Sequence, residues 1–266
     1  MASDAGRRTG ALTAGTLAQN SVRILGCRVD RVDMAGAVEQ IASFIEAGRF
    51  AQVVTLGAEM ANLAYRDERY RDVINAADLV VPDTLGIVLA SRWLGRPVPE
   101  RVPGIDLLER LCAESVARGW RMFLLGGSDG VATQAGAALA GRHAGLQIAG
   151  AQHGYFPAED GESVARRIRE SGARLAFVGM GFPRQEYWIS EHRNALGPVT
   201  CIGVGGAFDV VSGRMPRAPL AIRRAGLEWL YRLVREPRRF ARQLALPVFA
   251  ARALRQAFFE RGHGER

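Results

Sequence analysis

Residues 51–86 read AQVVTLGAEMANLAYRDERYRDVINAADLVVPDTLG. Two short apolar runs, 51–56 and 78–82, flank a stretch whose apolar residues recur at helical spacing. Strands that are apolar on both faces and joined through a helix are typical of a parallel sheet covered on both sides. This stretch therefore predicts an α/β fold.

The same alternation continues through most of the chain. We expect strands near 51–56, 78–82, 120–126, 146–150, 174–180 and 199–204, and helices near 34–48, 58–76, 84–94, 105–118, 130–141, 159–171 and 184–195. Ligands of parallel sheets bind beyond the carboxyl ends of the strands. Glycine clusters at 126–127, 179–181 and 203–206 follow three of these strands. They can bring backbone N–H groups close to a phosphate, or serve the turns sterically.

The composition excludes several classes of protein. With 266 residues, 48% hydrophobic and 23% charged, the chain can form one large domain or a domain with an appendage. No apolar run approaches the ~18 residues needed to cross a bilayer. The three cysteines are widely spaced and predicted to be reduced core residues, and the four histidines supply no pair at ligand spacing. We expect a disordered leader over 1–22, an α/β domain over 23–215, and no metal or cofactor.

Positive charge is concentrated at the carboxyl end. All 35 basic residues are arginine, and the part after Gly213 has 13 arginines against 4 acidic residues. Residues 216–266 are therefore predicted to form a basic appendage that meets a polyanion, such as a phospholipid surface, a diphosphate or nucleic acid. Large apolar residues alternate with these arginines, which is typical of a helical membrane-surface element, although a solvated helix that caps the core has the same pattern.

Polar residues also follow the expected strands. Asp83 stands between a strand and a helix expected to start at Thr84, where it could act simply as an N-cap. Gln185 and Glu186 follow another strand, and Asp209 follows the last one. The stretch 179–184 ends in arginine where a dinucleotide fingerprint needs glycine, and a Walker motif requires a lysine that this chain lacks. Standard Rossmann dehydrogenases and P-loop enzymes are therefore disfavoured.

Several motifs together closely resemble the WecG/TagA/CpsF glycosyltransferase family over about residues 24–245. They occur in the family's order and spacing: Thr55, DTLG (83–86), PERVPG (99–104), HGYF (153–156), VGMGFPRQE (178–186), GVGGAFD (203–209), SG (212–213), RAP (217–219) and GLEWLYR (226–232). The resemblance implies a Rossmann-like α/β fold of the type called GT-E. It also implies an inverting, metal-independent transfer of a hexose from a UDP-sugar to a polyprenyl-diphosphate-linked sugar. Such a reaction would serve surface polysaccharide or cell-wall polymer synthesis, with the enzyme peripheral on the cytoplasmic face of the membrane.

The resemblance also implies roles for single residues. Asp83 matches the family's proposed catalytic base, and Asp209 matches the carboxylate of the nucleotide-side motif, which includes Gly205. Polar pocket residues are matched by Thr55, Arg101 and Gln185, and arginines that contact the diphosphate are matched by Arg232, Arg239 and Arg242. The resemblance further implies that the appendage over 216–266 touches the membrane and closes over the active site. Such a site is chemically consistent, because an inverting transfer needs one base and guanidinium groups can hold the leaving diphosphate.

Two positions depart from the family pattern. Gly57 stands where the family usually has asparagine, and Thr84 stands where it usually has glycine. Both flank the presumed sugar pocket, so glucose or another hexose is as open as an N-acetylmannosamine donor.

Other interpretations remain open from the residues alone. The chain could be a non-catalytic nucleotide-sugar sensor, or it could bind nucleic acid through its arginines, although no nucleic-acid reader motif is present. His153 could bind substrate or be structural, and Glu186 could pin the loop that carries Gln185 or meet a ligand. A homo-oligomer that hides part of the appendage is compatible with the sequence.

Overall fold

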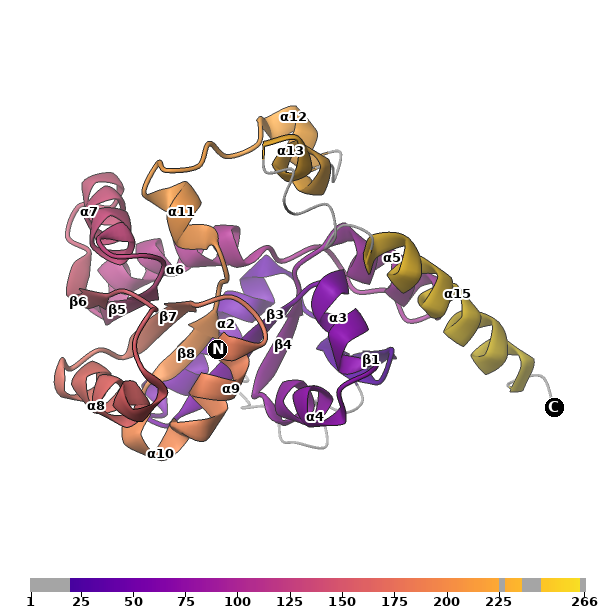
Figure 1. The fold of residues 1–266 in the computed structure, drawn as a ribbon, viewed down its shortest axis with the longest axis horizontal. Coiled ribbons are helices and arrows are strands. Elements are labelled where there is room, and N and C mark those ends of the chain that lie inside the picture. The colour runs from indigo at the N-terminus through magenta and orange to yellow at the C-terminus, as the bar shows by residue number, and fades with distance from the viewer. Residues whose placement is uncertain (1–19, 225–227, 236–244, 264–266) are drawn as a thin grey trace, which may run out of the picture.

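The structure is a computed structural model and describes residues 20–224, 228–235 and 245–263. Within these ranges, six strands form one sheet in the order β4-β3-β8-β7-β5-β6, and every neighbouring pair is parallel (Figure 1). The strands are β3 (Ala51–Leu56), β4 (Leu79–Pro82), β5 (Arg121–Gly126), β6 (Gln147–Gln152), β7 (Leu175–Gly179) and β8 (Thr200–Gly203). The α/β prediction is confirmed, and each expected strand lies within two residues of its observed ends.

Helices cover both faces of the sheet. Successive residues of each strand point to opposite sides, and most of them are apolar, so both faces have to be buried. One face packs against α2 (Met34–Glu46), α6 (Gly104–Arg118), α7 (Val131–Arg142) and α11 (Ala207–Val211). The other packs against α3 (Ala58–Ala64), α4 (Glu68–Ala76), α5 (Leu85–Trp93), α8 (Gly161–Glu170) and α9 (Arg184–Glu191), and α15 (Ala245–His263) packs on α3 and α5. Short helices η1 (Ala158–Asp160) and α10 (Arg193–Leu196) flank α8 and α9. The three cysteines are free and buried, as predicted, and burial raises the pKa of Cys27 and Cys112 to about 12.

An amino-terminal hairpin was not predicted. Strand β1 (Ser21–Ile24) pairs antiparallel with β2 (Cys27–Asp30), so Ser21 and Val22, which the sequence analysis assigned to the leader, form the start of a strand. Leu25 and Gly26 make the turn with φ of 50° and 84°, the positive angles of a tight two-residue hairpin. Each strand has four residues, too few for the alternation of apolar residues to be visible in the sequence.

The helix expected over 58–76 is two helices. Helix α3 ends at Ala64, and α4 begins after Asp67, whose side chain accepts a hydrogen bond from the Tyr70 N–H at 3.0 Å. An aspartate at this position is a favoured N-cap. The apolar spacing continues through the break, so periodicity alone predicts one helix where there are two.

The carboxyl-terminal part contains α12 (Leu220–Arg224), α13 (Glu228–Arg235) and α15. Figure 1 shows α12 and α13 set apart from the sheet layers, between α11 and α15. Arg232 lies in α13, whereas Arg239, Arg242 and the bend expected at Pro237 lie outside the described residues.

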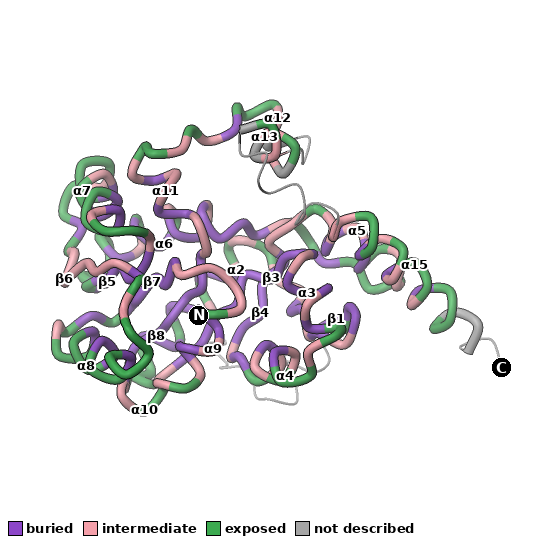
Figure 2. Tube along the Cα trace, viewed as in Figure 1, coloured by how far each residue is buried: buried purple, intermediate pink, exposed green. Residues whose placement is uncertain are grey.

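Helix α15 is apolar on two sides. Phe249 and Ala253 are buried against α3 and α5, while Val248, Leu254 and Phe258 are exposed on the opposite side. Figure 2 shows that the burial class changes repeatedly along this helix. The helix is fixed to the hairpin by Gln256, which accepts from the Leu25 N–H at 2.8 Å and donates to the Arg23 carbonyl at 2.9 Å. None of the helices in the described ranges is long and apolar enough to span a bilayer.

Candidate active site

The carboxyl ends of the six strands lie along one edge of the sheet, because the strands are parallel. Gly57 follows β3, Asp83 follows β4, and residues 203–206 end and follow β8. Strands β4 and β8 are separated by β3 alone, so the ends of β4 and β8 are about 10 Å apart at ~4.8 Å per strand. The sequence-predicted residues around Asp83 and Gly205 therefore belong to neighbouring loops.

Asp83 lies half-buried at the end of β4 and contacts a helix other than the one that follows it. Its Oδ1 accepts a hydrogen bond from the Gly104 N–H at 2.7 Å, at the start of the 15-residue helix α6. Its own N–H donates to the Leu56 carbonyl at 3.0 Å, and Val102 N–H donates to the Pro82 carbonyl at 2.7 Å. The simple N-cap interpretation is therefore wrong for α5, whose N-cap is Thr84.

Gly57 and Thr84 are in contact with each other. Thr84 Oγ1 accepts from the Ala58 N–H at 3.2 Å, so the side chain links the start of α5 to the start of α3. A Cβ on Gly57 would lie 3.3 Å from the Thr84 methyl carbon. The two departures from the family pattern thus occupy one small volume beside Asp83.

Thr55 is buried beneath this surface. Its hydroxyl donates to the Gly203 carbonyl at 2.7 Å, and its side chain packs against Gly104, where a Cβ would lie 3.3 Å from the Thr55 methyl carbon. Thr55 therefore fixes β3 to β8 and supports the start of α6, and it is 7% exposed.

Arg101 is the point where the carboxyl-terminal part meets this edge. Its guanidinium pairs with the Glu228 carboxylate of α13 at 3.1 Å, and the two side chains are 23% and 17% exposed. Two further arginines fix the segment between α11 and α12: Arg217 pairs with Asp106 of α6, and Arg214 donates to Ser128 Oγ at 3.0 Å. Glu228 and Asp106 carry no signal in the sequence that marks them as ion-pair partners, although Glu228 lies in the GLEWLYR motif.

Gln185 and Glu186 lie inside the protein. Gln185 Nε2 donates to Glu186 Oε1 at 2.7 Å, and Gln185 Oε1 accepts from the Gly205 N–H at 3.0 Å. Glu186 Oε2 also accepts from the Tyr70 hydroxyl at 3.0 Å. Burial raises the pKa of Glu186, and the hydrogen bonds from Gln185 and Tyr70 oppose that rise. Glu186 thus pins the side chain of Gln185, one of the two roles left open by the sequence.

The remaining residues, Asp209 and His153, lie in a short helix and in a loop. Asp209 is half-buried in α11, where its carbonyl accepts from the Met215 N–H at 2.8 Å. His153 is half-buried after β6, far along the sheet from Asp83, and its neighbour Gly154 donates to the Gly127 carbonyl at 2.9 Å. The structure brings Thr55, Gly57, Asp83, Thr84 and Arg101 together, and it separates His153 from them.

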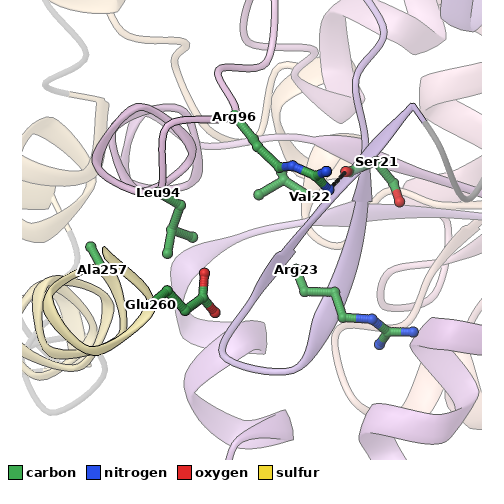
Figure 3. A pocket seen from close by; sticks show the side chains of 7 residues that line it. All are labelled: Ser21, Val22, Arg23, Leu94, Arg96, Ala257 and Glu260. Atoms are coloured by element: carbon green, nitrogen blue, oxygen red, sulfur yellow. Dashed lines mark hydrogen bonds between the residues drawn. The ribbon is translucent and has the colours of Figure 1, made fainter. Parts of the chain in front are cut away.

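A cavity of about 410 Å³ lies elsewhere, between β1, the end of α5 and α15 (Figure 3). None of its lining residues belongs to a loop that follows a strand of the six-stranded sheet: Ser21, Val22, Arg23, Leu94, Arg96, Ala257 and Glu260. Across the described ranges, no three His, Cys, Asp or Glu side chains are grouped to hold a metal ion.

Comparison with known proteins identifies the family. A family model described as the glycosyl transferase WecG/TagA/CpsF family matches residues 22–263. The chain belongs to this family. It is similar to the N-acetylglucosaminyldiphosphoundecaprenol N-acetyl-beta-D-mannosaminyltransferases of Staphylococcus aureus strains MW2 and NCTC 8325 / PS 47. Each is 36% identical over 230 residues, which cover 86% of this chain and 90% of the relative.

The match of the WecG/TagA/CpsF model includes the sheet, the hairpin from Val22 onward, and α12, α13 and α15. All the candidate residues described above lie within it. The carboxyl-terminal helices are thus part of the glycosyl transferase family's shared sequence.

Proposed function

We propose that the protein is an inverting, metal-independent glycosyltransferase that moves a hexose from a UDP-sugar to a polyprenyl-diphosphate-linked sugar. Family membership supports glycosyl transfer, and the names of the S. aureus relatives support a diphosphoundecaprenol-linked acceptor. The observation that carries the proposal is the position of Asp83. Its carboxylate stands at the carboxyl edge of a parallel sheet, oriented by the Gly104 N–H at 2.7 Å.

Asp83 is assigned the role of general base. An inverting transfer needs a carboxylate that removes the proton of the acceptor hydroxyl while its oxygen attacks the anomeric carbon from the face opposite the leaving group. The hydrogen bond from Gly104 fixes the orientation of the carboxylate, and Thr55 supports Gly104 from below. A carboxylate held in one orientation can meet the acceptor hydroxyl in the same geometry each time, as proton transfer requires.

The leaving UDP builds negative charge that cationic and N–H groups must stabilise. Arg101 lies beside Asp83 on the loop that leads into α6, and Arg232, Arg239 and Arg242 come from the carboxyl-terminal part. Arginine suits this role, because its planar guanidinium can bind two phosphate oxygens at once. The turn at Gly205 and the carboxylate of Asp209 are assigned to the nucleotide side of the donor.

Residues 216–266 are assigned a second role as a membrane-docking appendage on the catalytic domain over 23–215. On α15, exposed Val248, Leu254, Phe258 and Phe259 lie beside the exposed Arg255. Apolar side chains next to arginines are the pattern of helices that lie in the surface of an anionic membrane. Docking there, on the cytoplasmic face, would place the site beside its lipid-linked acceptor.

The donor hexose is left open between N-acetylmannosamine and other hexoses. The relatives' names give an N-acetylmannosaminyl group, but Gly57 and Thr84 alter the polar groups beside Asp83. A lost amide and an added hydroxyl change which sugar substituents can be hydrogen-bonded.

The test uses the full chain with a polyprenyl-diphosphate-sugar analogue and a panel of UDP-hexoses, without divalent metal. We expect UDP release with at least one donor, and Asp83→Asn should reduce the rate by about 10²- to 10⁴-fold while UDP binding is retained. Asp33→Asn, at the N-cap of α2, is the matched control and should keep the wild-type rate. An Asp83→Asn variant with the wild-type rate would reject the base, and no release from any donor would favour a nucleotide-sugar sensor.

A further inference from the structure

A buried chain of hydrogen bonds leads from α4 to the turn after β8. It runs from the Tyr70 hydroxyl to Glu186 Oε2 at 3.0 Å, from Gln185 Nε2 to Glu186 Oε1 at 2.7 Å, and from the Gly205 N–H to Gln185 Oε1 at 3.0 Å. Tyr70, Glu186 and Gln185 are exposed by 0%, 1% and 2%. Because the carboxylate accepts from Nε2, the amide oxygen of Gln185 must face Gly205.

The turn is packed on its inner side and open on its outer side. A Cβ on Gly203 would lie 2.6 Å from Gln185 Nε2, so the Gln185 amide lies directly against the backbone of this glycine. Gly205 has a φ of +53°, and a Cβ built on it would meet no atom within 4 Å. The buried chain therefore ends on backbone that faces the carboxyl edge of the sheet.

A buried carboxylate is costly, and an apolar side chain would fill the same space at a lower cost. Burial accordingly raises the pKa of Glu186. The hydrogen bonds of this carboxylate fix the orientation of one amide, and that amide holds one backbone N–H. A fully hydrogen-bonded network of this kind sets local geometry more strictly than apolar packing does.

We propose that Glu186 and Gln185 are positioning residues that hold the turn at residues 203–206 in the shape that receives the diphosphate of a nucleotide donor. The proposal rests on the proposed UDP-sugar donor. Gln185 acts through Gly205 rather than by contacting the donor, since the residue is 2% exposed and its amide bonds to Glu186 and Gly205 inside the protein. A glycine turn suits this ligand, because its backbone can approach phosphate oxygens closely.

Gln52 provides a matched control. Its Nε2 donates to the Glu186 carbonyl at 3.1 Å, and the residue is 5% exposed. Gln52→Met and Gln185→Met therefore remove the same amide from the same buried region, but only Gln185→Met frees Gly205. Titration of UDP into each full-length protein by calorimetry gives the affinity, and amide hydrogen exchange reports on the Gly205 N–H.

We expect Gln185→Met to weaken UDP binding at least tenfold and to speed exchange at Gly205, while Gln52→Met changes UDP binding less than twofold. Both should lower the melting temperature by similar amounts. Wild-type affinity in Gln185→Met, or an equal loss in both variants, would overturn the positioning role. A wild-type protein that binds no UDP, with Gly205 exchange still dependent on Gln185, would instead overturn the proposed donor and the ligand assigned to the turn.

Discussion

Gly57 and Thr84 depart from the family pattern in two separate sequence motifs, but they lie next to each other in the structure. The Thr84 methyl carbon lies 3.3 Å from the position of a Gly57 Cβ, which is tighter than ordinary van der Waals contact. Gly57 has a φ of −103°, so its backbone accepts any residue and the neighbouring methyl group alone limits its size. A side chain at 57 would therefore press on the methyl group at 84, and one of the two would have to shift by a few tenths of an ångström.

This contact predicts coupled stabilities. Gly57→Asn should destabilise the wild-type protein by about 1–3 kcal/mol through overpacking. In a Thr84→Ser background, which keeps the hydroxyl that accepts from Ala58, the cost should fall by at least ~0.5 kcal/mol. Urea unfolding of the four proteins measures the coupling. Strictly additive effects would show that the Thr84 methyl group does not limit residue 57.

Glu186 predicts a specific dependence of stability on pH. Burial raises its pKa from the ordinary value of 4.5, so the folded protein keeps this proton at pH values where the unfolded chain has lost it. Folding then takes up a proton, and stability falls as the pH rises above 4.5 toward the raised pKa. Glu186→Gln removes this contribution. The free energy of unfolding of the variant minus that of the wild type should increase across this interval, measured by urea unfolding from pH 4 to 8.

The pH range over which stability falls depends on Glu186 and on the groups that contact it. Burial and the adjacent Glu186 both raise the pKa of Tyr70, so this hydroxyl stays protonated and continues to donate throughout the range. Asp67→Asn is the comparison variant. It changes another carboxylate near α4, one that accepts a hydrogen bond from the Tyr187 hydroxyl. A difference curve that is flat with pH for Glu186→Gln would contradict the raised pKa.

The sequence predicted which residues stand at the strand ends, but it did not predict how deep they lie. Asp83 and Gln185 both follow apolar strands, and hydrophobic periodicity locates both. Burial depends on which segments cover the loop: Asp83 meets α6, which starts 21 residues later, and Gln185 lies against Gly203 and accepts from the Gly205 N–H, 20 residues later. Hydrophobic periodicity cannot predict such contacts, because the segments that meet are far apart in the sequence.

Helix α15 illustrates the same limit for a longer segment. Its alternation of apolar and arginine residues predicted an amphipathic surface helix, whereas the described helix is apolar on two opposite sides. Phe249 lies against α5, where a Gly86 Cβ would be 3.5 Å from its ring, and Phe258 is 78% exposed. One side therefore packs on the core, and the other is available for a membrane.

Substitution of Phe249 and of Phe258 should have different effects, on stability in the first case and on membrane binding in the second. Phe249→Ala should destabilise the protein by about 3–5 kcal/mol because it leaves a cavity. Phe258→Ala should change stability by less than about 0.5 kcal/mol. The same exposed variant should weaken binding to anionic vesicles at least about tenfold, since a buried phenylalanine contributes ~1.5–3 kcal/mol. Urea unfolding and vesicle sedimentation measure the two effects.

The control for the membrane measurement is Val116→Ala, an exposed apolar residue on α6. It should leave vesicle binding unchanged. If Phe258→Ala also bound vesicles as the wild type does, the outer side of α15 would not be the docking surface, and the arginines of the appendage would have to act without it.

Side chains of the described residues fix the carboxyl-terminal part to the core at several points. Arg214 and Arg217 hold its beginning to α7 and α6, Glu228 holds α13 to Arg101, and α15 is fixed to the hairpin by Gln256. Figure 1 shows the resulting arc from α11 through α12 and α13 to α15. The Arg101–Glu228 pair joins α13 to the loop beside Asp83. We propose that this pair couples closure of the carboxyl-terminal part over the site to Arg101, which we assigned to the donor diphosphate.

That link predicts non-additive effects of Arg101→Gln and Glu228→Gln. The pair is partly buried, at 23% and 17% exposure, so each substitution should cost about 1 kcal/mol and speed amide exchange in α13 by about fivefold. The double variant should exchange no faster than the faster single variant, because both remove one interaction. Arg118→Gln, which breaks the exposed pair with Glu114 on α6, should leave α13 exchange unchanged. Effects that multiply in the double variant would mean that Arg101 and Glu228 hold α13 through separate contacts, and closure would then not depend on this pair.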